Sequence, residues 1–436
     1  MSGPLIGGDE VNAIVLDVGT YQVKAGYAGE DAPKFICPSV VGVGGESLAA
    51  AKKGSDSAAM ETDERMIRAG VNALEVPRDN MEVVSPFKDG LLDDWDAVEA
   101  LWDHMLKDQM RLTTDEHPMM LAEPSQNEKA VREKMVEIMF EKYNVPAVFV
   151  AKNAVLSSFA IGRQTSLVID SGHESTVVSA VHDGYVLKKS IIKTPIAGHF
   201  LTKCMQHTIE EKGIAVKPRY SFKRVDTAGA APIVEDIDCS RITDSFKAYH
   251  IDAICQDAKH AVCRQLSDTP FSPEENANIP NVTYELPDGQ EIHIGPQRFS
   301  IPELLFNPSL ANGFGSVGEE ILRTPDVENK GLSQLVTECI GKCDIDVRRE
   351  LYNGILLTGG TSLFASLQKR LEDEVTNLAP SMMKVRVISP SNAIEKRYST
   401  WIGGSILASL GTFQQMWMSK SEYKEYGAGL IHKKAP

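Results

Sequence analysis

The sequence predicts an α/β fold of two similar lobes with a ligand-binding cleft between them, and three observations support this prediction. The chain has 436 residues, more than a single hydrophobic core usually supports. An apolar strand that ends in an Asp-x-Gly turn and continues into a second extended stretch occurs twice. Elsewhere, segments with helical periodicity alternate with strand-like segments, as is typical of α/β proteins.

The repeated unit consists of a strand, a short glycine turn and a second strand, an order typical of a β-hairpin. The first copy runs through residues 13–16, Asp17-Val18-Gly19-Thr20 and residues 22–27, and the second through residues 166–169, Asp170-Ser171-Gly172 and residues 176–181. Two copies in one chain predict an internal duplication. We expect residues 1–160 plus 399–436 to form the first lobe and residues 161–398 to form the second.

Helix signals accompany these strands. Asp94 precedes an apolar stripe and is expected to cap a helix, and Ser125 with Glu128 matches a capping box. Residues 154–161 predict a third helix, which ends at Gly162.

Three segments break the pattern of helices and strands: residues 42–70, 217–240 and 311–330. They are rich in small, proline or acidic residues, which rarely build a packed core. We predict that each is a mobile surface loop or insertion.

Composition and charge narrow the class of protein. Hydrophobic residues make up 42% and charged residues 24% of the chain, an ordinary soluble composition, and we expect neither a signal peptide nor a membrane span. The seven cysteines are expected to be reduced thiols and not zinc ligands. The net charge of −15 disfavours direct sequence-specific DNA binding. It leaves open basic partners such as histones, or a role in solubility alone.

The two turns suit phosphate and metal chemistry. Backbone N–H groups on the concave side of such a turn can bind phosphate oxygens, and glycine permits close approach. Asp17 and Asp170 end their strands and can hold Mg²⁺, directly or through water. A third strand, within residues 354–361, ends at Gly359-Gly360 and offers another close approach to a ligand. Lys24 either contacts the phosphates or is an ordinary solvated charge.

Several motifs resemble the actin family over nearly the whole chain, apart from the three irregular segments. They are YELPDGQ from Tyr284, CDIDVR from Cys343, LTGGT from Leu357 and WIGGSILASL from Trp401. Further motifs are similar to those of nuclear actin-related proteins of chromatin-remodelling and histone-acetyltransferase complexes, the actin-like six or actin-related protein four class. These are GGDEV from Gly7, VPRDNMEVVSPFKDG from Val76 and VHDGYVL from Val181.

The resemblance implies the fold shared by actin, heat-shock ATPases and sugar kinases, with ATP and Mg²⁺ between the lobes. Carried over residue by residue, it places the metal near Asp17 and Asp170, through water. It assigns nucleotide binding to Gly19, Thr20, Tyr21, Lys24, Ser171, Gly172, Gly198, Gly359, Gly360, Thr361, Leu363 and Phe364.

The groups that hydrolyse ATP in actins differ in this chain. Asn153 stands where actins have the glutamine that positions water, His173 replaces an aspartate, and Val177 replaces a histidine. Tyr21 and Glu174 replace glycines of the two turns. Because small displacements of a nucleophile cost large factors in rate, we predict little or no ATPase activity. His173 has no partner visible in the sequence, which favours lost function over a new catalytic role.

The resemblance also implies partners and a location. Changes within residues 42–70 and 308–330 affect segments by which actins form filaments, so we predict no homopolymer. The implied partners are actin, a helical segment of a remodeller motor subunit and other chromatin-complex subunits, in the nucleus. The alternatives are a filament-forming cytoskeletal ATPase and, less well matched, a sugar kinase or chaperone ATPase.

Overall fold

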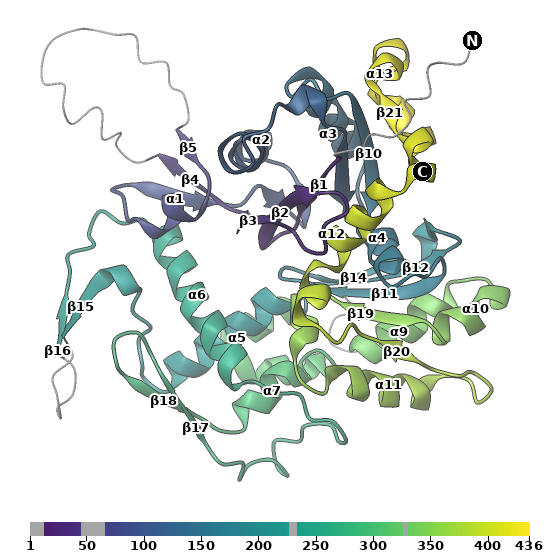
Figure 1. Cartoon of the computed structure of the whole chain (residues 1–436). Coiled ribbons are helices and arrows are strands. Elements are labelled where there is room, and N and C mark those ends of the chain that lie inside the picture. Colours follow the sequence, from purple (N-terminus) through teal and green to yellow (C-terminus); the bar gives the residue numbers. More distant parts are fainter. Residues whose placement is uncertain (1–12, 45–65, 226–232, 326–329) are drawn as a thin grey trace, which may run out of the picture.

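The computed structural model describes residues 13–44, 66–225, 233–325 and 330–436, which form two α/β lobes, one above the other in Figure 1. Buried apolar side chains form one large cluster in each lobe. The first includes residues between 13 and 156 and between 401 and 435, and the second includes residues between 167 and 387. The structure thus confirms the predicted two-lobed α/β fold.

The sheet of the first lobe has six strands. Their order is β21 (Met418–Ser419), β10 (Ala147–Lys152), β9 (Met119–Glu123), β1 (Ile14–Val18), β2 (Gln22–Tyr27) and β3 (Phe35–Pro38). The predicted hairpin is β1 with antiparallel β2, in which Asp17 lies opposite Lys24. On its other side β1 pairs in parallel with β9.

The sheet of the second lobe repeats this arrangement. Its strands are β13 (Tyr185–Val186), β12 (Thr176–His182), β11 (Ser166–Ser171), β19 (Ile355–Thr358) and β20 (Val387–Ile388), with β14 (Ile192–Thr194) also paired to β12. Here β11 lies between antiparallel β12 and parallel β19, as β1 lies between β2 and β9. The shared pairing is what an internal duplication predicts.

Smaller elements surround the two sheets. The remaining strands are β4 (Val41–Gly44), β5 (Ile67–Arg68) and β6 (Met81–Val84), which form one sheet, and the pairs β7 (Phe87–Lys88) with β8 (Leu91–Leu92), β15 (Phe222–Val225) with β16 (Ile233–Asp236), and β17 (Val282–Glu285) with β18 (Glu291–Ile294). Twelve of the described α-helices are α1 (Val71–Glu75), α2 (Trp95–Asp103), α3 (Lys129–Glu141), α5 (Gly198–Glu211), α6 (Asp244–Val262), α7 (Gln297–Glu303), α8 (Gly315–Leu322), α9 (Leu332–Gly341), α10 (Ile345–Tyr352), α11 (Leu367–Leu378), α13 (Lys420–Tyr426) and α14 (Ile431–Lys434). None of the described helices is long and apolar enough to cross a membrane.

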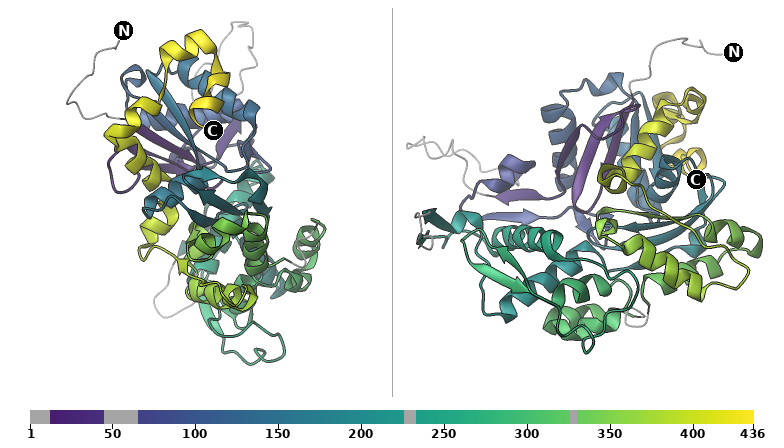
Figure 2. Two further views of the ribbon diagram at one scale, coloured as in Figure 1. Left: turned by 90° about the vertical axis from the view of Figure 1, so that its right-hand side faces the viewer. Right: turned by 60° about the horizontal axis from the view of Figure 1, so that its bottom comes forward.

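Two further helices, α4 (Asn153–Ala160) and α12 (Ala393–Ser409), pack against each other where the two lobes meet (Figures 1 and 2). Their contact is close because Gly403 lies against the backbone of Leu156; a Cβ at Gly403 would stand 1.8 Å from the Leu156 carbonyl oxygen. α12 is kinked at Tyr398, which has non-helical dihedral angles. The pair therefore fixes how the lobes join.

The structure confirms two of the three predicted helix ends. Asp94 accepts a hydrogen bond from the Ala97 N–H at 3.2 Å, and so caps α2 as expected. α4 ends at Ala160, shortly before Gly162, also as expected. The prediction of a capping box at Ser125 is wrong. α3 begins only at Lys129, because the Asn127 N–H bonds to the Pro124 carbonyl and keeps this segment in a turn.

Residues 311–330 were predicted to be a mobile surface loop or an insertion, and the loop is wrong for most of their described part, which is helical. Pro308–Phe314 forms a 3₁₀ helix that leads into α8, and both pack near α5. Ala311 and Phe314 are buried. Gly318 lies against the Ala311 carbonyl, where a Cβ would approach within 1.7 Å. Glycines that suggest a loop by propensity thus serve close helix packing here.

The other two irregular segments are also partly regular. Within residues 217–240, β15 and β16 form a two-stranded hairpin in place of the predicted loop. Residues 42–44 and 66–70 include strands of the β4–β6 sheet. The rest of the predicted 42–70 insertion, residues 45–65, lies outside the described residues.

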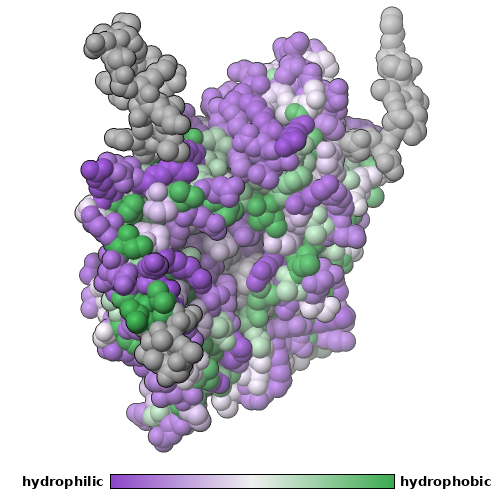
Figure 3. Space-filling model, turned by 60° about the vertical axis from the view of Figure 1, so that its left-hand side comes forward, coloured by the Kyte–Doolittle hydropathy of each residue, from purple (hydrophilic) through white to green (hydrophobic). Residues whose placement is uncertain are grey.

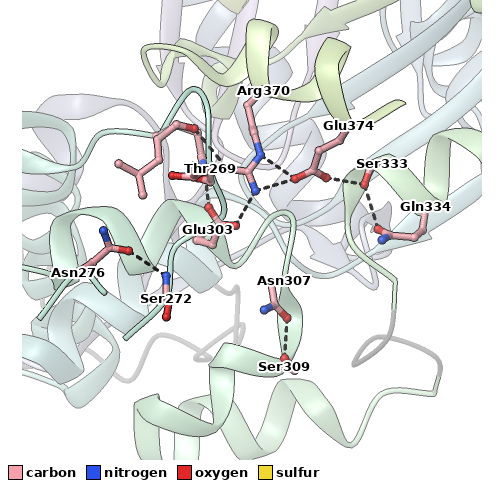
Figure 4. Close-up of polar contacts among 12 residues, drawn as sticks. Thr269, Ser272, Asn276, Glu303, Asn307, Ser309, Ser333, Gln334, Arg370 and Glu374 are labelled. Carbon is pink, nitrogen blue, oxygen red and sulfur yellow. Dashed lines mark hydrogen bonds and ion pairs between the residues drawn. The ribbon is translucent and has the colours of Figure 1, made fainter. Parts of the chain in front are cut away.

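A buried ion cluster joins three elements of the second lobe (Figure 4). Arg370 of α11 donates from Nη2 to Glu303 Oε1 at 2.9 Å and from Nε to Glu374 Oε1 at 2.6 Å. Its Nη1 donates to the Thr269 carbonyl at 2.6 Å. Arg370 and Glu303 are only 3% and 1% exposed. The guanidinium therefore links α11, the end of α7 and the loop after α6.

Candidate functional site

A cavity of about 740 Å³ lies between the lobes, within the usual range for small-molecule sites. The surface view from the side of α6 shows the molecule hollowed between its upper and lower halves (Figure 3). The cavity is bordered by the first turn at Gly19, the second turn at Gly172 and the third glycine pair at Gly359-Gly360. The structure thus brings together three loops that are far apart in the sequence.

Almost all residues singled out in the sequence line this cavity. They are Asp17, Gly19, Thr20, Tyr21, Lys24, Asn153, Asp170, Gly172, His173, Val177, Gly198, Gly359, Gly360, Thr361, Leu363 and Phe364. Ser171 does not line it: its buried hydroxyl lies 2.9 Å from Thr176 Oγ1. The side chain of Ser171 therefore stabilises the β11–β12 hairpin.

The two Asp-Gly turns are closed by equivalent backbone hydrogen bonds. The Gly19 N–H bonds to the Gln22 carbonyl at 3.1 Å, and the Gly172 N–H bonds to the Ser175 carbonyl, also at 3.1 Å. The duplication therefore extends to the hydrogen bond that closes each turn. Residues of both turns line the cavity, and backbone N–H groups of such turns are suited to binding anions.

Glycine is required where the third loop meets the second turn. Gly359 has a φ of +92°, and a Cβ there would lie 2.3 Å from the Ser171 carbonyl oxygen. Thr361 Oγ1 and the Gly198 N–H both donate to the Gly172 carbonyl, at 2.8 and 3.0 Å. These contacts hold the loops at a fixed distance across one side of the cavity.

Among the charged groups of the cavity, Lys24 and Asp17 form an ion pair and Asp170 has a shifted pKa. Lys24 Nζ lies 2.7 Å from Asp17 Oδ2, so its ammonium is already bonded to a carboxylate. Burial, reinforced by the nearby Asp17, raises the pKa of Asp170 to about 6. Two carboxylates close enough to repel each other are suited to a shared divalent cation, which would relieve that repulsion.

His173, for which the sequence shows no partner, lies between two rings. Its ring centroid is 5.0 Å from that of Tyr21 in the first turn and 5.1 Å from that of His199. Burial, together with the charges of His199 and Lys259, lowers the pKa of His173 to about 3. The imidazole is therefore neutral near pH 7 and a weak base, unsuited to taking a proton from water.

Glu174 does not line the cavity, although its neighbours His173 and Ser175 do. Its carboxylate accepts a hydrogen bond from the Gly90 backbone of the first lobe, and burial raises its pKa. Lys193 of the second lobe donates to the neighbouring Asp89 carbonyl at 2.5 Å. The Glu174 carboxylate of the second turn therefore takes part in a contact between the lobes.

Three buried polar atoms of the cavity lining have no hydrogen-bond partner among the described residues. They are Gln126 Oε1, Asn153 Oδ1 and Ser179 Oγ. Buried polar atoms are rarely left unsatisfied, so they indicate a polar ligand or its bound water. With the glycine loops and the two carboxylates, these groups fit a nucleotide with a divalent cation.

The sequence did not predict that α6 and α12 form one wall of the cavity. Gln256, Lys259 and His260 of α6 and Arg397 and Tyr398 of α12 all line the cavity. Lys259 donates to the Gly198 carbonyl at 2.7 Å, and burial lowers its pKa to about 8. The available signal was a set of polar residues at helical spacing along α6, which resembles an ordinary solvated face.

Comparisons with known proteins agree with this geometry. The family model described as "Actin" matches residues 8–436. The chain is 48% identical to "Actin-related protein 4" of Oryza sativa subsp. japonica over 448 residues, which cover 99% of this chain and 100% of the relative. It is 48% identical to the protein of that name in Arabidopsis thaliana, with the same coverage, and 36% identical to that in Yarrowia lipolytica, over 98% of this chain and 97% of the relative. The chain therefore belongs to the actin family and, within it, to the actin-related protein 4 class.

Proposed function

We propose that the chain is a non-filamentous nuclear subunit of chromatin-remodelling and histone-acetyltransferase assemblies, which binds ATP between its lobes with little or no hydrolysis. The observation that carries the nucleotide part is the cavity between two equivalent Asp-Gly turns, with Asp17 and Asp170 at its base. The assembly part is supported by the class to which the chain belongs and by the altered filament segments.

ATP with Mg²⁺ is expected to stabilise the folded protein. A ligand at a hundred times its dissociation constant contributes about 2.7 kcal/mol. Asp170→Asn is the informative variant: because the surroundings of this carboxyl raise its pKa above the usual value, we expect the ligand-free variant to be at least as stable as the unaltered protein. It should, however, lose the part of the stabilisation that depends on Mg²⁺. Thermal unfolding with ATP, with and without EDTA, measures both effects. An equal Mg²⁺ effect in both proteins contradicts this assignment of the metal site.

Hydrolysis is expected to be at least about a hundredfold slower than that of conventional actin, because several groups that order water are replaced. The variant N153Q/H173D/V177H restores the residues that actins have at these positions, and we expect it to release phosphate measurably faster. Adding Asp170→Asn to that variant should remove the gain, since the metal carboxylate is lost. Phosphate release by purified monomer measures all three proteins, and turnover of the unaltered chain at actin-like rates contradicts the proposal.

The proposed partners are actin, a helical segment of a remodeller motor subunit and other subunits of such complexes. One altered segment is an ordered addition: the 3₁₀ helix Pro308–Phe314 and α8 present a packed helical surface. This surface supports the proposal that the protein binds one neighbouring subunit but does not extend a polymer. A filament grows only if each subunit uses both of its contact faces. Histone binding is a further proposal, supported only by the net charge of −15.

Recovery of the tagged protein from nuclei tests the assembly part. We expect motor subunits and actin to accompany it in stoichiometric amounts. A tagged conventional actin, purified in parallel, is the matched control for adventitious actin binding. Recovery in a cytoplasmic filament fraction without motor subunits would favour the alternative of a cytoskeletal ATPase.

A further inference from the structure

A second cavity, of about 340 Å³, lies within the second lobe and shares no lining residue with the cavity between the lobes. Four segments border it: the loop after α6 at Pro270, the segment after α7 at Phe306 and Asn307, the start of α9 and the second half of α11. Its volume is at the lower end of the range for small-molecule sites, roughly 300–1,000 Å³. The cavity therefore suits a single side chain or a group of similar size.

The charged side chains of this cavity are two carboxylates and one guanidinium, so their net charge is −1. Arg370 bonds to both Glu303 and Glu374 (Figure 4). Arg370 and Glu303 are almost fully buried, whereas the Glu374 side chain is 25% exposed. Glu374 is therefore the charged group that a ligand can reach from solvent.

Glu374 also has acceptor capacity left. Its Oε1 bonds to the Arg370 guanidinium at 2.6 Å, and its Oε2 accepts the Ser333 hydroxyl at 2.8 Å. A carboxylate offers about four lone pairs, so Oε2 can accept a further donor. Beside Glu303, the buried Gln265 Oε1 has no hydrogen-bond partner among the described residues. Both observations indicate that the cluster has more acceptors than donors.

Two helix ends meet at the cavity, and only one has a charge that matches its dipole. α9 begins next to Ser333, where the Glu374 carboxylate already complements the positive end of the helix. α11 ends with Asn377 and Leu378 at the cavity, and its last turn contains no basic residue. The negative end of α11 is thus unmatched, and a cation placed there is favoured.

An anion or a metal ion fits the cavity less well than an organic cation. The guanidinium of Arg370 is already bonded to two carboxylates, which would repel an anion. In the part of the chain that the structure describes, no group of three His, Cys, Asp or Glu side chains could hold a metal ion. Phe306 and Leu378 also border the cavity. Their apolar side chains suit the aliphatic stem of a lysine or an arginine.

The surface next to the cavity is partly apolar. Leu378 is 49% exposed, and Met382, four residues further on, is 94% exposed. Protein interfaces commonly place one anchoring side chain in a pocket and surround it with contacts that exclude water. A protein segment can therefore use the cavity and this apolar surface together, which a free amine cannot do.

We propose that the second cavity binds one lysine or arginine side chain of a partner protein. Glu374 is its counter-ion, and Leu378 and Met382 contact the partner residues on either side of it. The partner segment is thus basic at one position and apolar next to it. This inference goes beyond the proposed function and requires no nucleotide between the lobes.

The test compares Glu374→Gln with a matched control, Glu338→Gln. Glutamine keeps the shape of Glu374 and can still accept from Ser333, and the pair of Arg370 with Glu303 remains. Glu338 of α9 has a similarly exposed side chain, at 33%, which also bonds to basic side chains but does not line the cavity. The control therefore removes a comparable carboxylate from the same lobe.

Binding of a short fluorescent peptide, with one lysine between leucines, is measured by fluorescence anisotropy on the full chain. We expect Glu374→Gln to bind it at least about tenfold more weakly, because a hydrogen bond between charged groups is lost. Glu338→Gln should stay within about twofold of the unaltered protein. Leu378→Ser should weaken binding about threefold by removing apolar contact, and it carries the test if Glu374→Gln folds poorly.

Changes to the peptide separate this site from other kinds of site. A peptide with norleucine in place of lysine should bind weakly, and equally so to the unaltered protein and Glu374→Gln. Tighter binding of a peptide with glutamate in that place would overturn the proposal in favour of an anion site. Butylamine that binds as tightly as the lysine peptide would overturn the partner protein in favour of a free amine. Absence of binding to the unaltered protein, or equal binding to Glu374→Gln, overturns the site itself.

Discussion

Gly403→Ala is expected to destabilise the protein by at least about 3 kcal/mol, near the upper end of what overpacking usually costs. The new Cβ would lie 1.8 Å from the Leu156 carbonyl oxygen and 2.4 Å from its carbon, and a backbone group cannot move aside as a flexible side chain can. α12 must therefore shift away from α4. Because Asn153 of α4 and Thr400 of α12 both line the cavity, the shift should also weaken nucleotide binding. Chemical denaturation and nucleotide titration measure the two effects.

Gly411→Ala is the matched control for this substitution. Gly411 follows α12 and lacks a positive φ, and a methyl group added to its Cα would meet no atom within 4 Å. An alanine there should change stability by less than about 1 kcal/mol, with no loss of binding. Equal stabilities of the two variants would show that α4 and α12 can separate without cost, contrary to the close packing described above.

The parts of the site that the sequence predicted are local in character. A strand followed by Asp-x-Gly determines its own turn, so Asp17 and Asp170 could be placed from a few neighbouring residues. Their repetition then predicted two facing lobes. The same local logic placed Asp94 as a helix cap. Local sequence gave a wrong prediction at Ser125, because Asn127 forms a competing turn and the helix begins only at Lys129.

The parts that could not be predicted depend on contacts between distant segments. Lys259 and His260 face the cavity only because α6 packs against α5, and no pattern within α6 distinguishes that face from a solvated one. The partners of His173 come from Tyr21 and His199, far apart in the chain. The helical character of residues 308–322 depends likewise on Gly318 meeting the Ala311 backbone, a tertiary requirement that overrides low helix propensity.

Arg370→Met is expected to destabilise the second lobe by about 3–5 kcal/mol, the cost of leaving a buried charge without its partner. Methionine fills most of the space of the arginine stem. The Glu303 carboxylate, which is 1% exposed, then has only neutral donors, the Gln265 amide at 2.8 Å and the Phe271 backbone N–H. Replacing both charges, in E303Q/R370M, should recover part of the loss, because no buried charge then remains. Arg323→Met, which breaks an exposed pair with Glu319, is the control and should cost less than about 0.5 kcal/mol.

The pH dependence separates this explanation from a simple packing defect. Burial raises the pKa of Glu303 even in the intact cluster, where Arg370 opposes that shift. Without the guanidinium the pKa should rise further, so the folded variant binds a proton more tightly than the unfolded chain does. The deficit of Arg370→Met is then largest above the folded-state pKa and shrinks as the pH falls toward the unfolded value of about 4.3. Denaturation at neutral and acid pH measures this change, and a deficit independent of pH would assign the loss to packing alone.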